Sequence, residues 1–358
     1  NLVLVGGSIV FYGFACNWNL LALGILLAVT VITYPLALQL AKRGRGWLLG
    51  ICLGTLAAVL VFFKLFAGGR YLPVGMSFYL FQTAAMLIDN YRGTVEPEKN
   101  FLRHSAGLVM FPKILSGPIV SPRTLQEQSR NCNTGFDAIH KGLQTFVLGL
   151  AMKVIVANRL GGFWNQGSVL GYDIISPAFA WTSLIAYALR LYLDFQGYSL
   201  MAIGLGRMLG YELPHNFRDP YAATSIAQFY RRWHITLGAW FREYIYIPLG
   251  GNRKGQLVTI LNLAVVWAFT GFWHGVGGNY LVWAGILLFC IVNERLWLGK
   301  LLNKAKVISH IYTIGVILLS WVPFAIGDWG QMMTFFGKLF GMGAVVANPM
   351  DFVAYGGH

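Results

Sequence analysis

The stretch LLALGILLAVTVITYPLALQL, residues 20–40, carries no charged side chain and is apolar almost throughout. A helix needs about 20 predominantly apolar residues to cross the hydrocarbon core of a bilayer. Similar runs recur along the chain, and five more qualify or nearly qualify: 47–66, 142–157, 257–273, 280–292 and 307–326. The chain is therefore predicted to be a helical protein that crosses a membrane several times.

Shorter apolar runs lie at 2–15, 74–87, 107–115, 177–193 and 332–345. Together with the longer runs they predict about ten to eleven spanning or re-entrant helices. We expect one polytopic, all-α transmembrane domain over 1–358. The chain begins with Asn1 and ends in AYGGH, so we expect it to be truncated at one or both ends. No basic region precedes the first apolar run, and no cleavable signal peptide is expected.

The composition excludes an ordinary soluble protein. Of the 358 residues 56% are hydrophobic and only 11% are charged, whereas soluble domains carry about 25% charged residues. The formal net charge is +14. Because cytoplasmic loops of membrane proteins collect lysine and arginine, this charge predicts a lipid bilayer, and not a nucleic acid, as the partner. The basic loops at 42–45, 123–130, 231–254 and 295–306 are predicted to face the cytoplasm.

One segment is too polar to span a membrane. QFYRRWHITLGAWFREYIYIPLGGNRKG, residues 228–255, holds four arginines, a lysine, a histidine and seven aromatic residues. From 226 to 244 its apolar positions follow the spacing of an amphipathic helix. Arg231 and Arg242 are eleven residues apart, about three turns, so they are predicted to share the polar face, with His234 near it. We expect this helix to lie in the interface or to dip into the protein.

A second segment is too broken to span. FPKILSGPIVSP, residues 111–122, places three prolines and a glycine among apolar side chains. Proline interrupts a helix, and irregular backbone at membrane depth is tolerated only where protein or a water-filled cavity surrounds it. This segment is predicted to be a re-entrant or interfacial elbow.

Ionisable side chains within apolar segments are site candidates, because burying them in a membrane is costly. Asp194, His234 and His274 lie in such segments beside glycine or aromatic residues. The pKa of histidine suits proton transfer near neutral pH. A histidine can also be a packing residue, and Asp194 can cap a helix or pair with an arginine. No zinc-binding spacing of Cys and His occurs, so no metal and no permanently bound cofactor are expected.

Several stretches carry a resemblance to a known family. LDFQGYSLMAIGLGRMLGYELPHNFRDPYAATSIAQFYRRWHITLGAWFREYIYIPLGGNRKG (193–255), followed by TGFWHG (270–275), resembles the membrane-bound O-acyltransferase (MBOAT) family. FPKILSGPIV (111–120) and SWVPFAIGDWGQMMTFFGKLFG (320–341) resemble its bacterial alginate O-acetyltransferase branch. The resemblance covers about residues 72–341 and is most specific between 193 and 275.

The resemblance implies a bundle of helices around a tunnel that joins the two membrane faces. The two signature histidines of the family map onto His234 and His274, and the latter is implied to be catalytic. An acyl thioester donor, expected to be acetyl-coenzyme A, would enter from the cytoplasm, and a hydroxyl acceptor from outside. The predicted substrate-binding residues are Asp194, Trp233, Trp273, Arg231, Arg242, Arg253 and Lys254.

The expected acceptor is an exported polysaccharide, or a secreted SGNH-type acetyltransferase or esterase that relays the acetyl group. The expected location is the bacterial cytoplasmic membrane. D-alanyl transfer or peptidoglycan O-acyl transfer by the same fold stays an alternative, and so does a proton-coupled transporter or flippase. A straight helix from Lys254 would carry His274 about 30 Å away, near the far membrane face, whereas the resemblance implies a position inside the tunnel.

Overall fold

The computed structural model describes residues 1–42, 45–66, 72–130, 132 and 134–343. Within these ranges the chain is helical without any strand, apart from an isolated antiparallel bridge between Phe217 and Trp233. It divides into two compact units. Unit 1 comprises Asn1–Leu148 with Tyr198–His215, and unit 2 comprises Gly149–Gly197 with Asn216–His358. The predicted all-α class is confirmed, and the single domain stays a prediction.

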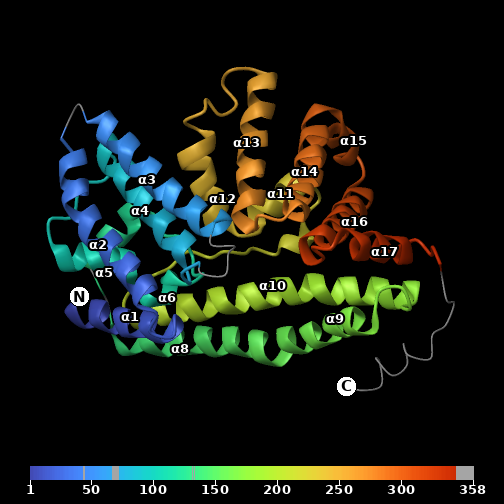
Figure 1. Cartoon of the computed structure of the whole chain (residues 1–358), viewed down its shortest axis with the longest axis horizontal. Helices are drawn as coiled ribbons and strands as arrows, with labels where there is room; N and C mark the ends of the chain where they lie inside the picture. The colour runs from blue at the N-terminus through green and yellow to red at the C-terminus, as the bar shows by residue number, and fades with distance from the viewer. Residues whose placement is uncertain (43–44, 67–71, 131, 133, 344–358) are drawn as a thin grey trace. The chain divides into compact units, whose positions relative to one another are not determined.

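Unit 1 is built from the N-terminal helices and the ends of two longer ones (Figure 1). Its helices are α1 (Leu2–Ala15), α2 (Leu20–Leu40), α3 (Gly46–Leu65), α4 (Met76–Arg92), α5 (Phe101–Val109), α6 (Phe111–Ile114), α7 (Pro122–Arg130), most of α8 (Phe136–Ala151) and the C-terminal part of α10 (Pro177–Met208). Helix α4 packs against both α2 and α3, and α5 packs against α1 and α2. More than half of α4 is buried, so α4 is the central helix of this unit.

Unit 2 contains the segments with the candidate histidines. It comprises the remainder of α8 and α10, η1 (Met152–Ala157), α9 (Asn158–Leu170), η2 (Pro220–Ala222), α11 (Ile226–Arg232), α12 (Ile235–Phe241), η3 (Arg242–Tyr246), α13 (Gln256–His274), α14 (Gly278–Asn293), η4 (Glu294–Leu298), α15 (Gly299–Leu302), α16 (Lys306–Ala325) and α17 (Trp329–Leu339). Helix α14 packs between α13 and α16 (Figure 1). The core of this unit is rich in aromatic side chains, including the buried Trp283 and Trp321.

Six helical segments of the described chain are long and apolar enough to cross a membrane: Leu20–Leu40, Gly46–Leu65, Phe136–Leu170, Gln256–His274, Gly278–Leu302 and Lys306–Ala325. Each coincides with or contains most of one of the six long apolar runs in the sequence. Their outward side chains are apolar and exposed, as lipid-facing residues are, for example Leu257 and Ile311. The total of ten to eleven spanning or re-entrant helices stays a prediction.

Three shorter segments refine the expected boundaries. The elbow at 111–122 is indeed broken, because α6 ends at Ile114 and α7 begins only at Pro122. The apolar run 177–193 continues as helix through Asp194 to Met208. The run 332–345 is represented by α17, which begins at Trp329 and ends at Leu339, and its last two residues lie outside the described residues.

Candidate active site

The predicted continuous helix over 226–244 is wrong, because the chain breaks at Trp233 and His234. Helix α11 ends at Arg232, and α12 begins at Ile235. His234 has φ 48° and ψ 53°, a left-handed conformation that costs free energy in a residue other than glycine and that persists only when its surroundings enforce it. The apolar periodicity continues across the break, so the sequence pattern alone does not reveal it.

The segment at 216–218 enforces this break. The backbone N–H of Ile235 donates to the Asn216 carbonyl at 2.9 Å, and Arg218 N–H donates to the Arg232 carbonyl at 3.0 Å. The fully buried Asn216 also accepts, through Oδ1, a 2.6 Å hydrogen bond from Thr236 Oγ1. These bonds satisfy backbone groups that the interrupted helix leaves without partners. The backbone of His234 is therefore fixed by hydrogen bonds on both sides, at Arg232 and at Ile235.

Glu294 anchors the other end of α11. Its Oε1 accepts a 2.6 Å hydrogen bond from Ile226 N–H, and its Oε2 accepts a 3.2 Å bond from Ala227 N–H. A carboxylate at this position satisfies free N–H groups and complements the positive end of the short helix. Neither Asn216 nor Glu294 was predicted from the sequence to be a site residue. An acidic residue two positions after the end of the apolar run 280–292 was the available signal for Glu294.

His274 is the last residue of α13 and lies among aromatic rings. Its ring centroid is 5.0 Å from that of Trp283 and 5.0 Å from that of Phe324. Trp273 contacts both histidines, with centroid distances of 4.6 Å to His274 and 6.0 Å to His234. The two histidines, from separate segments of the chain, thus share an indole neighbour.

Both histidines line one cavity of about 340 Å³ within unit 2. Trp233 and Trp273, which were predicted to bind substrate, line it too. Its α13 wall comes from residues three or four apart: Leu263, Val266, Trp267, Thr270, Trp273 and His274. One face of the helix therefore follows the cavity over twelve residues, about 16 Å.

A smaller cavity of about 190 Å³ shares two lining residues, Arg242 and Tyr246, with the larger one. Arg253 and the glycine pair Gly250–Gly251 also line it. Arg242 and Arg253 are exposed. Two guanidinium groups thus lie at a cavity adjoining the one that holds the histidines.

Burial determines the charge of His234. This side chain is 6% exposed and lies outside the six apolar spans. Burial lowers the pKa of His234 to about 3, and the proximity of His274 lowers this pKa further. His234 is accordingly neutral near pH 7, and a neutral imidazole both donates and accepts a hydrogen bond. It can contact a polar substrate group without bringing a net charge into the aromatic cavity.

Three other predicted residues lie outside these two cavities. Arg231 and Lys254 are exposed and line neither cavity. Arg231 and Arg242 were predicted to share one face of a continuous helix, but the helix breaks at His234. Asp194 forms an ion pair with Lys153. The partner is thus a lysine from a distant part of unit 2 and not the arginine considered from sequence.

Comparison with known proteins agrees with these features. Residues 10–317 match the family model described as MBOAT, membrane-bound O-acyltransferase family. The chain is 32% identical to a probable alginate O-acetylase AlgI of Pseudomonas fluorescens over 354 residues, which cover 96% of this chain and 70% of that protein. It is 32% identical to a peptidoglycan O-acetyltransferase of Helicobacter pylori over 90% of this chain and 70% of that protein.

A more distant relative is a teichoic acid D-alanyltransferase of Bacillus subtilis, 22% identical over 63% of this chain and 60% of that protein. All three relatives are named for the transfer of an acyl group. The family model covers most of the chain, including both histidine segments. The chain therefore belongs to the membrane-bound O-acyltransferase family and is an O-acyltransferase.

Proposed function

We propose that the protein transfers an acetyl group from acetyl-coenzyme A to a hydroxyl group of an exported polysaccharide, or to a secreted SGNH-type partner that relays it. One observation carries the proposal. His234 and His274 line a single cavity, and that cavity adjoins a smaller one with Arg242 and Arg253 at its wall. Acyl transfer from a phosphate-bearing thioester to a hydroxyl group needs basic side chains that bind the phosphates and imidazoles that transfer the proton.

The donor would bind with its phosphates at the arginines and its thioester at the histidines. Guanidinium groups bind phosphate oxygens through paired hydrogen bonds, and the basic segment around Arg253 suits the cytoplasmic side. Arg253 precedes α13, and His274 ends it, so the 19 residues of the helix separate them by about 28 Å. The α13 face along the cavity covers about 16 Å of this length and would offer a route for the arm of the donor.

In the proposed reaction an imidazole nitrogen of His274 removes the proton from the acceptor hydroxyl. The oxygen attacks the thioester carbonyl, and a tetrahedral intermediate forms. When the intermediate collapses, the carbon–sulfur bond breaks and the ester bond remains. The proton passes from His274 to the departing thiolate, which leaves as the thiol of coenzyme A. General acid–base catalysis of this kind contributes about 10²–10⁴-fold to a rate.

His234 would donate a hydrogen bond to the carbonyl oxygen as negative charge develops there. A donor that is already in position costs no reorganisation during the reaction. The left-handed backbone at His234, and the hydrogen bonds that Asn216 accepts from Ile235 and Thr236, fix the backbone that carries this side chain before substrate arrives. Trp233 and Trp273 would form the walls that exclude water from the thioester.

The acceptor class rests on the relatives. Two of them are named for acetyl transfer to alginate and to peptidoglycan, which are both polysaccharides. A hydroxyl of such a polymer, or a serine of a secreted relay protein, would reach the cavity from outside the bacterial cytoplasmic membrane. The D-alanyltransferase relative makes a carrier-bound D-alanyl group the alternative donor.

Transfer from labelled acetyl-coenzyme A tests the proposal. The full chain, reconstituted in lipid nanodiscs, is incubated with [¹⁴C]acetyl-coenzyme A and with periplasmic extract as a source of polysaccharide and relay proteins. We expect free thiol to appear together with alkali-labile label on one of these acceptors. Transfer from a D-alanyl carrier protein and none from acetyl-coenzyme A would overturn the donor assignment.

A further inference from the structure

Helix α14 contacts both of the segments that carry the candidate histidines. In its first half, the ring centroid of Trp283 lies 5.0 Å from that of His274 and 6.5 Å from that of Tyr230 on α11. Directly after its end, Glu294 accepts hydrogen bonds from the first two N–H groups of α11. The 16 residues of α14 form a rod about 24 Å long. One rigid helix therefore relates the position of α11 to that of His274.

Glu294 is a costly way to cap a short helix. Helix α11 already has a local cap, because Ser225 Oγ accepts a 3.0 Å hydrogen bond from Gln228 N–H. The N–H groups of Ile226 and Ala227 remain, and in many helices water or a neighbouring side chain satisfies such groups. Here they donate to Glu294, whose side chain is only 9% exposed. Because a buried carboxylate is expensive to desolvate, its use exceeds what the capping of seven residues requires.

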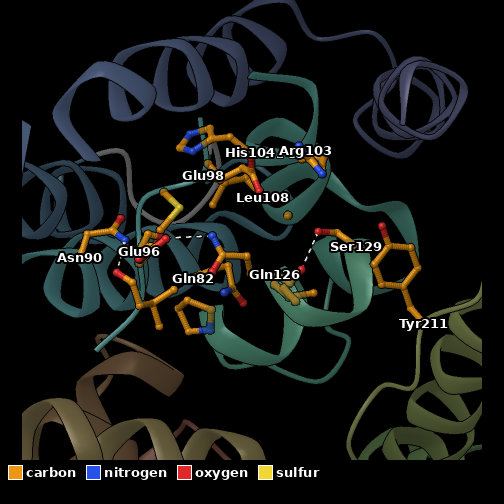
Figure 2. A pocket seen from close by; sticks show the side chains of 15 residues that line it. Gln82, Asn90, Glu96, Glu98, Arg103, His104, Leu108, Gln126, Ser129 and Tyr211 are labelled. Carbon is orange, nitrogen blue, oxygen red and sulfur yellow. Dashed lines mark hydrogen bonds and ion pairs between the residues drawn. The ribbon is translucent and has the colours of Figure 1, made fainter. Parts of the chain in front are cut away.

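A carboxylate of unit 1 shows the difference between a local and a long-range anchor. Glu98 lines a cavity of about 50 Å³ together with His104 and Arg103 (Figure 2). Its Oε1 accepts a 2.9 Å hydrogen bond from Asn100 N–H and lies 3.5 Å from Arg103 Nε. These partners are close in sequence, so Glu98 stabilises its own loop. The N–H groups that donate to Glu294 are 68 and 67 positions away, so Glu294 joins two separate elements.

The end of α11 opposite to this anchor leads to His234. Helix α11 has seven residues, about 10 Å, and only Trp233 separates it from His234. A second bond holds the chain just before α11, because His310 Nδ1 on α16 donates to the Ala223 carbonyl at 3.0 Å. A helix this short moves as one piece, so a displacement at its start is carried to its end.

The hydrogen bonds around His234 therefore serve two different purposes. Those at Arg232 and Ile235 attach its backbone to the segment 216–218 and fix the break between the helices. Those of Glu294 attach α11 to α14, the helix whose Trp283 packs against His274. Only the second set refers the position of one histidine to that of the other.

We propose that Glu294 is a positioning residue of the acyltransferase, which holds α11 on α14 and thereby sets the separation of the His234 and His274 imidazoles. The inference rests on the proposed function, in which both imidazoles act on one thioester. Glu294 lines neither cavity, so it acts through His234 and not on the substrate. Because a misplacement of about 1 Å can lower a rate about 10²-fold, loss of this anchor should lower kcat and leave donor binding intact.

Hydrogen–deuterium exchange of the full chain in nanodiscs tests the anchor without any substrate. Glu294→Gln should speed exchange over residues 226–234, because the first N–H groups of α11 lose their anionic acceptor. Asp328→Asn is the matched control, since Asp328 accepts a 2.8 Å bond from Gln331 N–H at the start of α17, which lines neither cavity. Exchange over 226–234 that is unchanged in Glu294→Gln would overturn the proposal, whatever reaction the protein catalyses.

Initial rates of acyl transfer test the positioning role, with acetyl-coenzyme A or with the D-alanyl carrier if the wild-type protein uses that donor. Glu294→Gln should lower kcat about 10–10²-fold at an unchanged KM for the donor, and Asp328→Asn should keep both values. In a His234→Ala background Glu294→Gln should cause no further loss, because the residue that it positions is gone. An unchanged kcat, or the same fold-loss in both backgrounds, would overturn the proposal.

Two further outcomes have a defined meaning. If the Glu294→Gln protein does not fold, Glu294→Asp replaces it, because this variant keeps the charge but withdraws the carboxylate by one methylene group. It should change exchange and kcat in the same direction. If the wild-type protein transfers from neither donor, the proposed function is refuted and the catalytic role of Glu294 with it, while faster exchange in Glu294→Gln would still establish the anchor.

Discussion

Each unit places a buried histidine beside a cavity, but the two cavities differ in kind. In unit 1 His104 is 3% exposed, and its Nε2 lies 3.4 Å from Thr33 Oγ1 in a polar wall. In unit 2 His234 is 6% exposed and packs edge-on against Phe195, with ring centroids 4.7 Å apart. The first cavity is small and rich in acceptors, whereas the second is about seven times larger in volume and walled by aromatic rings.

This difference shows that a buried histidine is not by itself evidence of a reactive site. His104 lies beside a threonine hydroxyl in a cavity of about 50 Å³, which leaves no space for two substrates. His234 shares its cavity with a second histidine from another segment, and the space is sufficient for a thioester and a hydroxyl. Volume and neighbours distinguish the two cavities, while the burial of the histidine does not.

The largest expected effect comes from removing the proposed base of unit 2. His274→Ala should lower acetyl transfer by about 10²–10⁴-fold, because it removes the group that accepts the proton of the hydroxyl in the proposed reaction. Transfer is measured as initial rates with saturating labelled acetyl-coenzyme A. His140→Ala, which removes an exposed histidine from unit 1, is the control and should keep the rate. A normal rate in His274→Ala, with unchanged expression and melting temperature, would refute the assignment.

An intermediate effect is expected at the arginines. The sequence predicted that Arg231 and Arg242 act alike, whereas only Arg242 lines the two cavities. Arg242→Gln should raise the KM for acetyl-coenzyme A about tenfold, since a charge-assisted hydrogen bond to phosphate is lost. Arg231→Gln should leave KM unchanged. Equal KM values in both variants would show that the smaller cavity does not hold the donor phosphates.

The smallest expected effect is the pH dependence of folding stability, to which His104 and His234 should contribute in the same direction. Burial lowers the pKa of His104 to about 4 and that of His234 to about 3, against about 6.5 in an unfolded chain. As the pH falls below about 6.5 the unfolded chain takes up these protons first, so each histidine reduces stability by at most about 1.4 kcal/mol per pH unit. The loss continues toward pH 4 for His104 and pH 3 for His234.

Melting temperatures between pH 7.5 and 4.5 check this expectation in detergent. The wild-type protein should lose stability as the pH falls, and His104→Gln and His234→Gln should each reduce the slope. If the slope of either variant equals that of the wild-type protein, the substituted histidine has the same pKa in the folded and the unfolded chain. Such a result for His234 would contradict the lowering of its pKa by burial.

Much of the fold could be predicted from the sequence, because a membrane helix depends on local length and hydropathy. The run at 20–40 coincides with α2, and the other five long runs each fall largely within one helical segment. The proline-rich elbow at 111–122 was also predictable, since proline interrupts a helix at the turn in which it lies. Both candidate histidines were identified from the polar and glycine-rich surroundings that are unusual beside apolar segments.

The rest of the fold and of the candidate site depends on contacts between segments that are distant in the sequence. The apolar periodicity of 226–244 predicts one helix, but the backbone bonds to Asn216 and Arg218 break it at His234. No local pattern at 226–244 encodes bonds that another segment supplies. The ion pair of Asp194 with Lys153 joins residues 41 positions apart, so sequence spacing could not identify the partner.

By itself the sequence determined that the helices of this protein lie in a lipid bilayer. Long uncharged runs make the helices stable in lipid, because each helix satisfies its own backbone hydrogen bonds. Only the tertiary structure decided which side chains meet: it brought His234 and His274 to one cavity, included Arg242, and left Arg231 outside. The reason is physical, since hydropathy acts along a single helix, whereas a cavity forms where the faces of several helices fail to fill the space between them.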